Sequence, residues 1–286
     1  MTREGASILA RLFYRRMAGR RVTLSENNPL AIIASDVPQL TGQAAVSLMR
    51  EHYAIEVVRA EPLVSERDQN FRLRTADGRR LVLKIANSAE DPVVTDFQIR
   101  ALQHMEDYQR RHGTRFNAPR IVLTADNRPQ VAASAGGQSH VVRVVTFVEG
   151  VPQGDEPPSI EYCRNAGRYL AELDLALRDF KHPGANQNLL WDMKRAADLR
   201  QLLPYISRTA VRDRVTRCLD HFEQQTLPHF DNLRWQVIHN DLNPDNVLIA
   251  AKDSPELAGI IDFGDMLEAP MIVDVAIAVS YLRRTA

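Results

Sequence analysis

The 286-residue sequence has only two cysteines, no net charge and no apolar run long enough to cross a bilayer. Cys163 and Cys218 are too few for a disulfide framework or a cysteine-based zinc site, which favours buried thiols in a reducing compartment, the cytoplasm. The longest apolar candidate, 271–282, is interrupted by Asp274 and is shorter than the ~20 residues of a membrane span. Because 36 basic residues balance 36 acidic ones, no field of one sign indicates nucleic acid as a partner.

Residues 1–40 differ in pattern from the rest of the chain. Arginines alternate with apolar residues up to about position 22, as in a basic amphipathic helix or a targeting segment, but Arg11 interrupts the apolar stretch of a secretory signal. A disordered extension, or a start codon read too far upstream, explains the same residues. We therefore expect residues 1–40 to be a basic N-terminal extension, and the fold is inferred from residue 41 onward.

Residues 41–149 predict a small lobe built on an antiparallel sheet. Thr41 precedes one helical pattern and Asp91-Pro92 opens another that runs to about residue 111, while the segments between and after them alternate and are rich in β-branched residues. Asp77-Gly78 is a strong hairpin signal. The five expected strands are 55–60, 69–75, 80–86, 120–124 and 141–148, with Lys84 on the third.

Residues 150–286 predict a second, mainly helical lobe. The break in pattern at 149–152 indicates the connection between the lobes, and apolar residues then recur at helical spacing from 159 to about 230. A short hairpin-like pair, 247–250 with 258–261, is the exception. The chain therefore predicts an α+β fold of two lobes, and no pattern in it indicates an oligomeric state.

The spacing H-x-D-x-x-x-x-N occurs once between apolar segments, at His239, Asp241 and Asn246, and Asp262-Phe263-Gly264 follows 16 residues later. Phosphoryl transfer needs an oriented hydroxyl group and metal ions that offset charge on the phosphates. Asp241 could accept the hydrogen bond of an attacking hydroxyl, with His239 bracing the loop. Asn246 and Asp262 offer the hard oxygen ligands that suit Mg²⁺. Taken singly, each of these residues is more simply a capping or core hydrogen-bonding residue.

The strings HNDLNPDNVLI, IIDFGD, VVTFVEG and SERDQNF resemble the aminoglycoside phosphotransferase and choline kinase family of protein-kinase-like folds, and within it the hydroxylysine kinase branch. The string IIDFGDM is also similar to kinase modules fused to class III aminotransferases. The resemblance extends from about residue 41 to the C-terminus. It implies a protein-kinase-like two-lobe fold and a small-molecule kinase that phosphorylates an alcohol, such as a hydroxylysine- or ethanolamine-like amino alcohol or an aminoglycoside.

The resemblance also implies a donor site for ATP or GTP. In it Lys84 reaches the α- and β-phosphates, although a strand lysine can instead face solvent. Ser65 lies where the family's phosphate-covering loop lies, but the segment lacks G-x-G-x-x-G, so its backbone amides would cradle the phosphates. Asp96 is the nearest acid to pair with Lys84; helical register also allows Gln98, and Asp96 could simply interact with the helix dipole. The backbone contacts to the base are implied for Thr146, Phe147 and Val148.

On the acceptor side the resemblance points to Trp191 and Asp192, and we add Asp265 as a further carboxylate. An aromatic face beside carboxylates suits an ammonium group, although Trp191 could equally be a packing anchor. Asp274 is an acid inside an apolar helix and must find a partner, because an unpaired buried carboxylate is costly. The resemblance implies that it supports the catalytic loop.

Two rival functions follow from the same residues. A protein kinase needs a long activation segment and an A-P-E element, whereas only 22 residues follow Gly264. The second rival is a regulatory module that binds a nucleotide but has no activity. The resemblance supports it in one respect: relatives of this family continue with further helices around the acceptor, so residues 150–286 look shortened at the C-terminus. The presence of Lys84, Asp241, Asn246 and Asp262 favours an enzyme.

Overall fold

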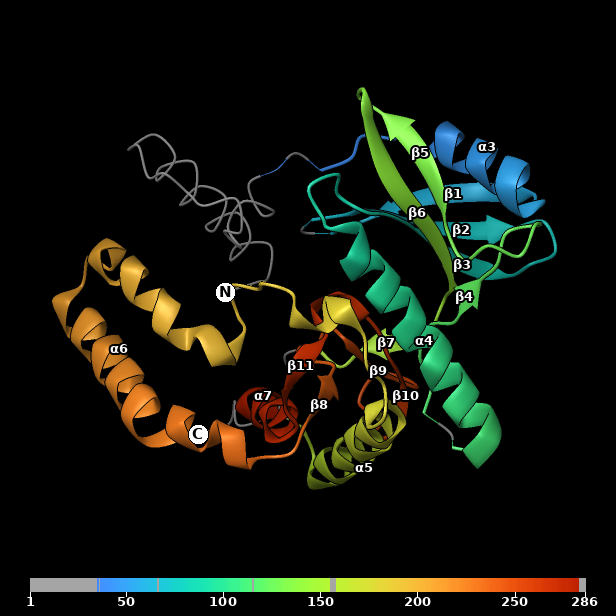
Figure 1. Ribbon diagram of the computed structural model, residues 1–286. Coiled ribbons are helices and arrows are strands. Elements are labelled where there is room, and N and C mark those ends of the chain that lie inside the picture. Colours follow the sequence, from blue (N-terminus) through green and yellow to red (C-terminus); the bar gives the residue numbers. More distant parts are fainter. Residues whose placement is uncertain (1–34, 36, 66, 115, 155–157, 283–286) are drawn as a thin grey trace. The chain divides into compact units, whose positions relative to one another are not determined.

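A computed structural model of the protein describes residues 35, 37–65, 67–114, 116–154 and 158–282 (Figure 1). The chain divides into two compact units. The first comprises residues up to Gly150 together with Ala258–Ile261, and the second comprises Val151–Leu257 and the residues from Asp262 onward. The expected N-terminal extension lies almost wholly outside the described residues.

The first unit is built on an antiparallel sheet in the order β1-β2-β3-β6-β4, with β5 paired to β6. In the register of this sheet, Asn70 of β2 and Arg143 of β6 both lie opposite Lys84 of β3. The β2–β3 turn is the expected one, and Gly78 in it has φ +87°. The strands are β1 (Val57–Leu63), β2 (Gln69–Thr75), β3 (Arg80–Ile85), β4 (Ile121–Val122), β5 (Val131–Ala135) and β6 (Gln138–Thr146).

The sheet has six strands, one more than expected. Strand β5 forms a hairpin with β6 across Gly136 and Gly137, which both adopt positive φ. The sequence Val-Ala-Ala-Ser-Ala of β5 gives a weak strand signal because small residues have low β propensity. The α+β fold class itself is confirmed.

Two helices belong to this unit. Helix α3 (Gly42–Tyr53) begins at Thr41, whose hydroxyl accepts from the backbone N–H of Ala44. Helix α4 (Pro92–His112) begins at Asp91, whose carboxylate accepts from the backbone N–H of Val93, and ends at Gly113 with φ +65°. Both starts follow the expected capping pattern.

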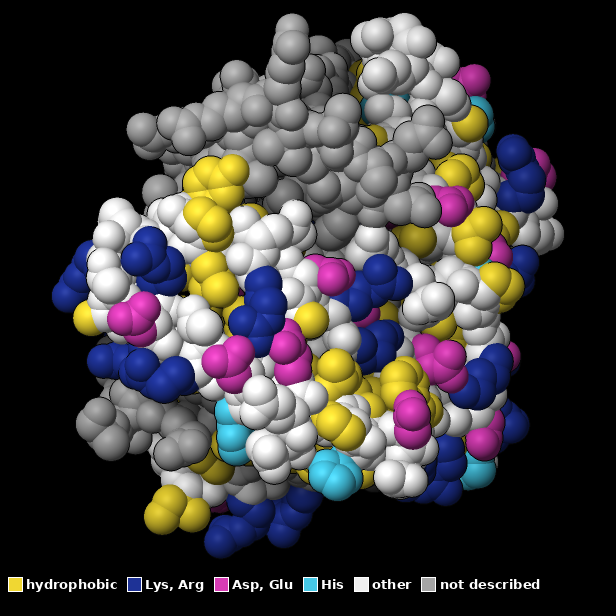
Figure 2. Space-filling view, turned by 60° about the vertical axis from the view of Figure 1, so that its left-hand side comes forward, with side chains coloured by type: hydrophobic (Ala, Val, Ile, Leu, Met, Phe, Trp, Pro, Cys, Tyr) yellow, Lys and Arg dark blue, Asp and Glu magenta, His cyan; other side chains and the backbone are white. Residues whose placement is uncertain are grey.

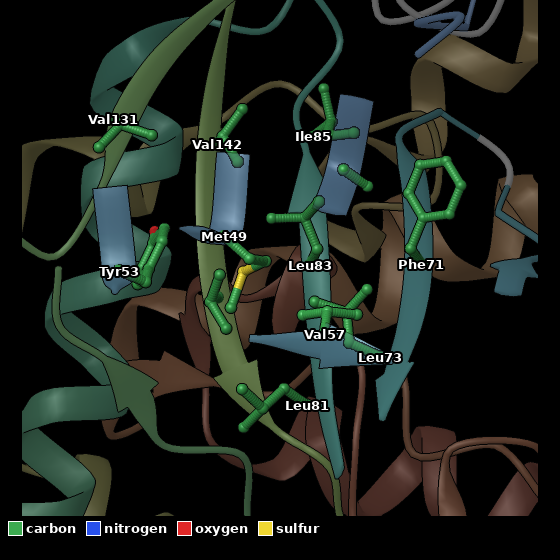
Figure 3. Close-up of a cluster of buried hydrophobic side chains, with 12 residues drawn as sticks. Met49, Tyr53, Val57, Phe71, Leu73, Leu81, Leu83, Ile85, Val131 and Val142 are labelled. Carbon is green, nitrogen blue, oxygen red and sulfur yellow. The ribbon is translucent and has the colours of Figure 1, made fainter. Parts of the chain in front are cut away.

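One face of the sheet packs on α3 and forms the core shown in Figure 3. Leu81, Leu83 and Ile85 of β3 point to this face and meet Met49 and Tyr53 of α3. Because side chains alternate along a strand, Lys84 points to the opposite face.

The second unit is mainly helical, with short antiparallel strand pairs. Strand β8 pairs with β11 and β7 with β9. The expected helical stretch up to residue 230 is interrupted between α5 and α6 by turns and by a 3₁₀ segment that contains Pro204. The elements of this unit are β7 (Val151–Pro152), α5 (Ile160–Leu177), η1 (Pro183–Asn186), η2 (Met193–Tyr205), α6 (Thr209–His221), η3 (Phe222–Thr226), η4 (Leu227–Asn232), β8 (Trp235–Ile238), β9 (Val247–Ile249), η5 (Phe263–Asp265), β11 (Leu267–Pro270) and α7 (Ile272–Leu282). Strand β10 (Leu257–Ile260) belongs, apart from Leu257, to the first unit.

The surface and the cysteines test the expectations from composition. Lys and Arg side chains are intermixed with Asp and Glu on the face that Figure 2 presents. Both cysteines are free thiols, but Cys218 is exposed and Cys163 half-buried, so the expectation of buried thiols is wrong. Among the described residues, no helix has the length and apolar character of a membrane span.

Candidate active site

The loop from His239 to Asn246 begins directly after β8. Ile238, the last residue of that strand, lies opposite Leu267 of β11, and both are fully buried in a core with Phe230 and Val273. A strand held by such a core gives the loop a fixed starting point.

The carboxylate of Asp241 is held by two asparagines of the same loop. Asn243 Nδ2 donates to Oδ1 of Asp241 at 2.7 Å, and Asn246 Nδ2 donates to Oδ2 at 2.7 Å and to the backbone carbonyl at 2.8 Å. Oδ1 of Asn243 accepts from the backbone N–H groups of Asp245 and Asn246. Both oxygens of Asp241 are therefore oriented by the chain itself.

Asn246 and Asp262 supply oxygen atoms of the kind that bind Mg²⁺. Because Nδ2 of Asn246 is directed at Asp241, Oδ1 of the same amide points elsewhere. Asp262 has φ +64° and opens the turn Phe263–Asp265. The described residues contain no group of three His, Cys, Asp or Glu side chains that could hold a metal ion. This donor set does not fit zinc but fits Mg²⁺, which takes few protein ligands and completes its shell with phosphates and water.

His239 braces the loop from within. Its side chain is fully buried, and Nδ1 accepts from the backbone N–H of Asp241 at 3.3 Å, which places the ring proton on Nε2. The ring meets Phe263 edge-to-face with centroids 4.8 Å apart. The histidine thus connects the Asp241 loop with the turn that follows Asp262.

Asp274 of α7 supports the same loop. Its carboxylate is fully buried and accepts from the backbone N–H groups of His239 at 2.9 Å and Asn240 at 2.8 Å. Asp274 therefore has the partners that a buried carboxylate was expected to need. Burial raises the pKa of Asp274, and the nearby His239 and the two backbone donors partly offset this.

Asp174 of α5 lies against Asp274. Burial first, and then the neighbouring Asp274, raise the pKa of Asp174 to about 8, while Arg234 lowers it. At neutral pH Asp174 is therefore protonated and donates its hydrogen bond to Asp274. The sequence analysis missed this residue. The sequence did carry a signal for it: Asp174 lies four residues after Leu170 and three before Leu177, which places it on the buried face of α5.

In the first unit, Lys84 is half-buried on the face of the sheet away from α3. Asp96, the expected acidic partner, is on α4 with 39% of its side chain exposed and lies 3.4 Å from Arg100 Nε. Gln98 is buried, and its Oε1 accepts from Nη2 of Arg143. Arg143 was not singled out from the sequence, although a charged residue inside Val-Val-Arg-Val-Val was a signal.

Thr146, Phe147 and Val148 lie at the end of β6 and just after it. The backbone N–H of Thr146 donates to Arg120 O at 2.9 Å and that of Phe147 donates to Arg80 O at 3.1 Å. Val148 is buried. Two of the three expected backbone donors are thus bonded within the unit.

Val148 packs against Gly259, which the first unit takes from β10. A Cβ at position 259 would lie 2.4 Å from Cγ1 of Val148 and 2.9 Å from the carbonyl oxygen of Asn117. Asn117 holds the same strand through its carbonyl, which accepts from Ile260 N, and through Nδ2, which donates to Ala258 O. The absence of a side chain at Gly259 therefore allows the close approach to Val148.

Ser65 lies between β1 and β2 and is half-buried. The segment that follows it is held by Asn87, whose backbone N–H donates to Oδ1 of Asp68 at 3.2 Å and whose Nδ2 donates to Arg67 O at 3.1 Å. Asn87 was not anticipated from the sequence. It fixes the position of the segment where the resemblance implies a phosphate-covering loop.

The residues expected on the acceptor side differ in exposure. Trp191 is 37% exposed, whereas Asp192 is buried. The Asp192 carboxylate caps η2 by accepting from Lys194 N at 3.0 Å, and the Lys194 ammonium lies 3.4 Å away. Asp265 is buried in the turn Phe263–Asp265.

Residues 59–286 match the family described as "Phosphotransferase enzyme family". Hydroxylysine kinase of Mus musculus is 28% identical over 272 residues, covering 87% of this chain and 71% of the relative. The solved structure of amicoumacin kinase hAmiN with AMP-PNP, Ca²⁺ and Ami has a TM-score of 0.63 at 13% identity, covering 85% of this chain and 70% of that one. A microcompartment-associated aminopropanol kinase has a TM-score of 0.55 at 18% identity, covering 84% and 74%.

Proposed function

The chain belongs to the phosphotransferase enzyme family, and we propose that it transfers the γ-phosphoryl group of ATP or GTP to the hydroxyl group of a small amino alcohol. Family membership and the likeness to hydroxylysine kinases confirm the broader expectation of a small-molecule kinase that acts on a hydroxyl group. The observation that carries the proposal is the Asp241 carboxylate, held by the amides of Asn243 and Asn246.

In the proposed reaction the acceptor oxygen forms a bond to the γ-phosphorus as the bond to the β,γ-bridging oxygen breaks, and a nucleoside diphosphate leaves. The acceptor hydroxyl donates a hydrogen bond to Asp241 and gives up its proton to it as the new bond forms. Asn243 and Asn246 hold the carboxylate in the direction of that proton. His239 and Asp274 act as positioning residues, since their contacts are with the backbone of the loop.

Asn246 and Asp262 are the residues that would hold Mg²⁺. When bound, the ion would offset the negative charge of the donor phosphates. The contribution of the chain is to aim the amide: Asn246 Nδ2 donates to the backbone carbonyl and to the carboxylate of Asp241, so Oδ1 is directed away from the base. One amide thereby orients the base and presents a metal ligand.

For the donor, we propose that Lys84 binds the α- and β-phosphates with Asp96 as its acidic partner, and that Ser65 and the segment after it cover the phosphates. Since the N–H groups of Thr146 and Phe147 are bonded to Arg120 O and Arg80 O, we assign the N–H donor to the base to Val148. A backbone N–H donor of this kind can bind either adenine or guanine. Both ATP and GTP are therefore tested below.

For the acceptor, hydroxylysine kinase and aminopropanol kinase are named for compounds that carry both an amine and a hydroxyl group. We propose the same class here, with aminoglycosides as its larger members. Trp191 would offer its exposed face to the ammonium group, with Asp192 and Asp265 supplying negative charge. The cap and ion pair that Asp192 already makes reduce its share in this recognition.

The direct test is turnover by the purified chain with Mg²⁺, ATP and GTP being offered separately against hydroxylysine, ethanolamine, aminopropanol, choline and an aminoglycoside. We expect acceptor-dependent release of diphosphate with at least one amino alcohol, at a kcat of about 1–100 s⁻¹. Nucleotide binding without turnover on any acceptor would favour the regulatory module over the kinase.

The acceptor assignment is tested with a matched pair of tryptophans. Trp191 and Trp235 are both 37% exposed, but Trp235 donates through Nε1 to Phe230 O and has the Lys194 ammonium 5.7 Å from its ring centroid. We expect Trp191→Ala to raise the KM for the acceptor about tenfold, and Trp235→Ala to leave it unchanged. An equal effect of both, or loss of donor binding in Trp191→Ala, would make Trp191 a packing residue.

We also propose that the chain works in the cytoplasm. Its two cysteines are both free thiols, as in a reducing compartment, and nucleoside triphosphates are abundant there.

A further inference from the structure

Arg143 is a buried cation directly beside the lysine of the proposed donor site. It lies opposite Lys84 in the register of β3 and β6, and its residue exposure is only 2%. Directly opposed residues of an antiparallel pair point to the same face, so Arg143 shares the face of Lys84, away from the core with α3. Its neighbours in β6, Val142 and Val144, belong to that core on the other face.

Two groups at or just before the start of α4 interact with this arginine, one by a hydrogen bond and one electrostatically. Nη2 donates to Oε1 of Gln98, two turns into the helix. Glu90 stands just before the helix cap, and its charge interaction with Arg143 lowers the pKa of the carboxyl, opposing the stronger effect of burial. Thr95 Oγ1 donates to Oε2 of Glu90 at 3.0 Å and so holds that carboxyl.

The same acid connects the arginine with the segment proposed to cover the phosphates. Glu90 interacts electrostatically with Asp68, which raises its pKa, and with Arg67, which lowers it. Asp68 and Arg67 are in turn bonded to Asn87. Arg143 is therefore the interior cation of a charged cluster that joins β6, the start of α4 and residues 67–68.

The surroundings of Arg143 destabilise the fold more than a residue with a role in packing alone would require. Like charges directly opposite one another on a sheet are destabilising. In addition, Nη1 of Arg143 is buried without a hydrogen-bond partner among the residues the structure describes, which is destabilising. An apolar side chain would fill the site in Val-Val-Arg-Val-Val at lower cost.

We propose that Arg143 is a positioning residue for the donor phosphates, an inference that rests on the proposed kinase function. It anchors the start of α4 through Gln98 and Glu90, and its charge directs the Lys84 ammonium away from β6, toward the polyanion that Lys84 binds. A bound triphosphate relieves the repulsion between the two cations. The contribution of Arg143 therefore depends on the phosphates and not on the base.

The test measures donor binding and turnover in Arg143→Met and Arg143→Lys. We expect Arg143→Met to weaken binding of the nucleoside triphosphate and to raise its KM about tenfold. Binding of the nucleoside without phosphates should change by less than about twofold, as should the acceptor KM. Arg143→Lys, which keeps the charge, should recover part of the loss. The matched control is Arg110→Met, which removes an exposed arginine of α4 paired with Asp107.

Each failure has its own signature. A wild-type chain that binds no nucleotide would overturn the proposed function together with this inference. Wild-type turnover with unchanged triphosphate binding in a folded Arg143→Met would overturn the inference alone, as would equal losses for triphosphate and nucleoside. If Arg143→Met does not fold, Gln98→Leu decides, because it keeps the cation and removes its link to α4. A triphosphate KM raised about threefold supports the proposal and an unchanged KM overturns it.

Discussion

The loop that carries Asp241 and the segment proposed to cover the phosphates are held in different ways. The hydrogen bonds of Asp241 to Asn243 and Asn246 lie inside the loop. Asp274 of α7 supports the loop by accepting from two of its backbone N–H groups. In the other segment, residues 67–70 are half-buried, and Asn87 bonds to Arg67 and Asp68 from outside the segment. The first is a preformed polar network and the second is a surface segment with an anchor.

The difference matches the role proposed for each region. A base must be placed within a fraction of an ångström of the hydroxyl proton, and a network that is satisfied before substrate arrives avoids reorganisation during the reaction. A phosphate-covering segment has to admit and release the nucleotide. Damage to the catalytic loop should therefore appear in kcat, and damage on the donor side in the KM for the nucleotide.

Among the residues that position the loop or the donor site, the largest expected effect comes from removing Asp274. Asp274→Ala leaves the N–H groups of His239 and Asn240 buried without an acceptor and takes the partner of Asp174 away. We expect stability to fall by about 3 kcal/mol and kcat by at least about a hundredfold. Chemical denaturation and steady-state kinetics measure the two. A stable Asp274→Ala enzyme with normal kcat would show that the loop does not need this support.

On the donor side, the strongest packing constraint is at Gly259. Gly259→Ala places a methyl group 2.4 Å from Val148 Cγ1, and we expect it to cost about 1–3 kcal/mol of stability and to weaken nucleotide binding, with kcat at saturation little changed. Gly167→Ala is the control, because an added Cβ meets nothing within 4 Å on α5, and alanine in a helix should stabilise by about 0.5–1 kcal/mol. Equal thermal shifts for both variants would contradict the packing argument.

A smaller effect is expected from the anchor of the phosphate-covering segment. Asn87→Ala removes the side-chain bond to Arg67 O, worth about 1 kcal/mol, and should raise the KM for the nucleotide about fivefold at nearly unchanged kcat. Initial rates over a range of donor concentrations provide the measurement. A fall in kcat with unchanged KM would reverse the proposed division between the two regions.

The smallest effect concerns the Asp174–Asp274 pair and is read from pH. Asp174 has a pKa of about 8 in the folded chain and an ordinary value of 3.8 when unfolded, so between these limits the folded state holds a proton that the unfolded state has lost. Stability from this group is therefore full at low pH and is lost as pH rises toward 8. Asp174→Asn keeps a donor to Asp274 without titrating. We expect its stability relative to wild type to improve by at least about 1 kcal/mol from pH 6 to pH 8.

Urea denaturation of both proteins at the two pH values measures this difference. Arg234 and His239 are the charged or titratable neighbours of the pair, so the comparison is made against wild type at each pH and not from one slope. Parallel pH profiles for wild type and Asp174→Asn would show that Asp174 is ionised in the folded protein.

Much of the first unit could be predicted from local pattern. The hairpin at Asp77-Gly78, the caps Thr41 and Asp91, and the strand of Lys84 each depend on residues that are neighbours in sequence. Strand β5 could not, because its small residues acquire their strand conformation by pairing with β6. Strand β11 was missed for the same reason, because it forms only by pairing with β8.

The candidate site divides along the same line. His239, Asp241 and Asn246 are within eight residues, so their spacing alone could suggest their roles. Asp174 meets Asp274 across 100 residues of sequence and Gln98 meets Arg143 across 45. An acid or arginine inside an apolar stretch of the sequence indicates that it needs a partner, but only the fold identifies that partner.

The central claim is that Asp241 is the base on a loop built before substrate binds, and Asp241→Asn tests it most directly. The measurement pairs kcat with the dissociation constant of the nucleotide, using the acceptor that supports turnover in wild type. We expect kcat to fall by about 10²–10⁴-fold while the dissociation constant stays within about threefold. Undiminished turnover in Asp241→Asn would contradict the account.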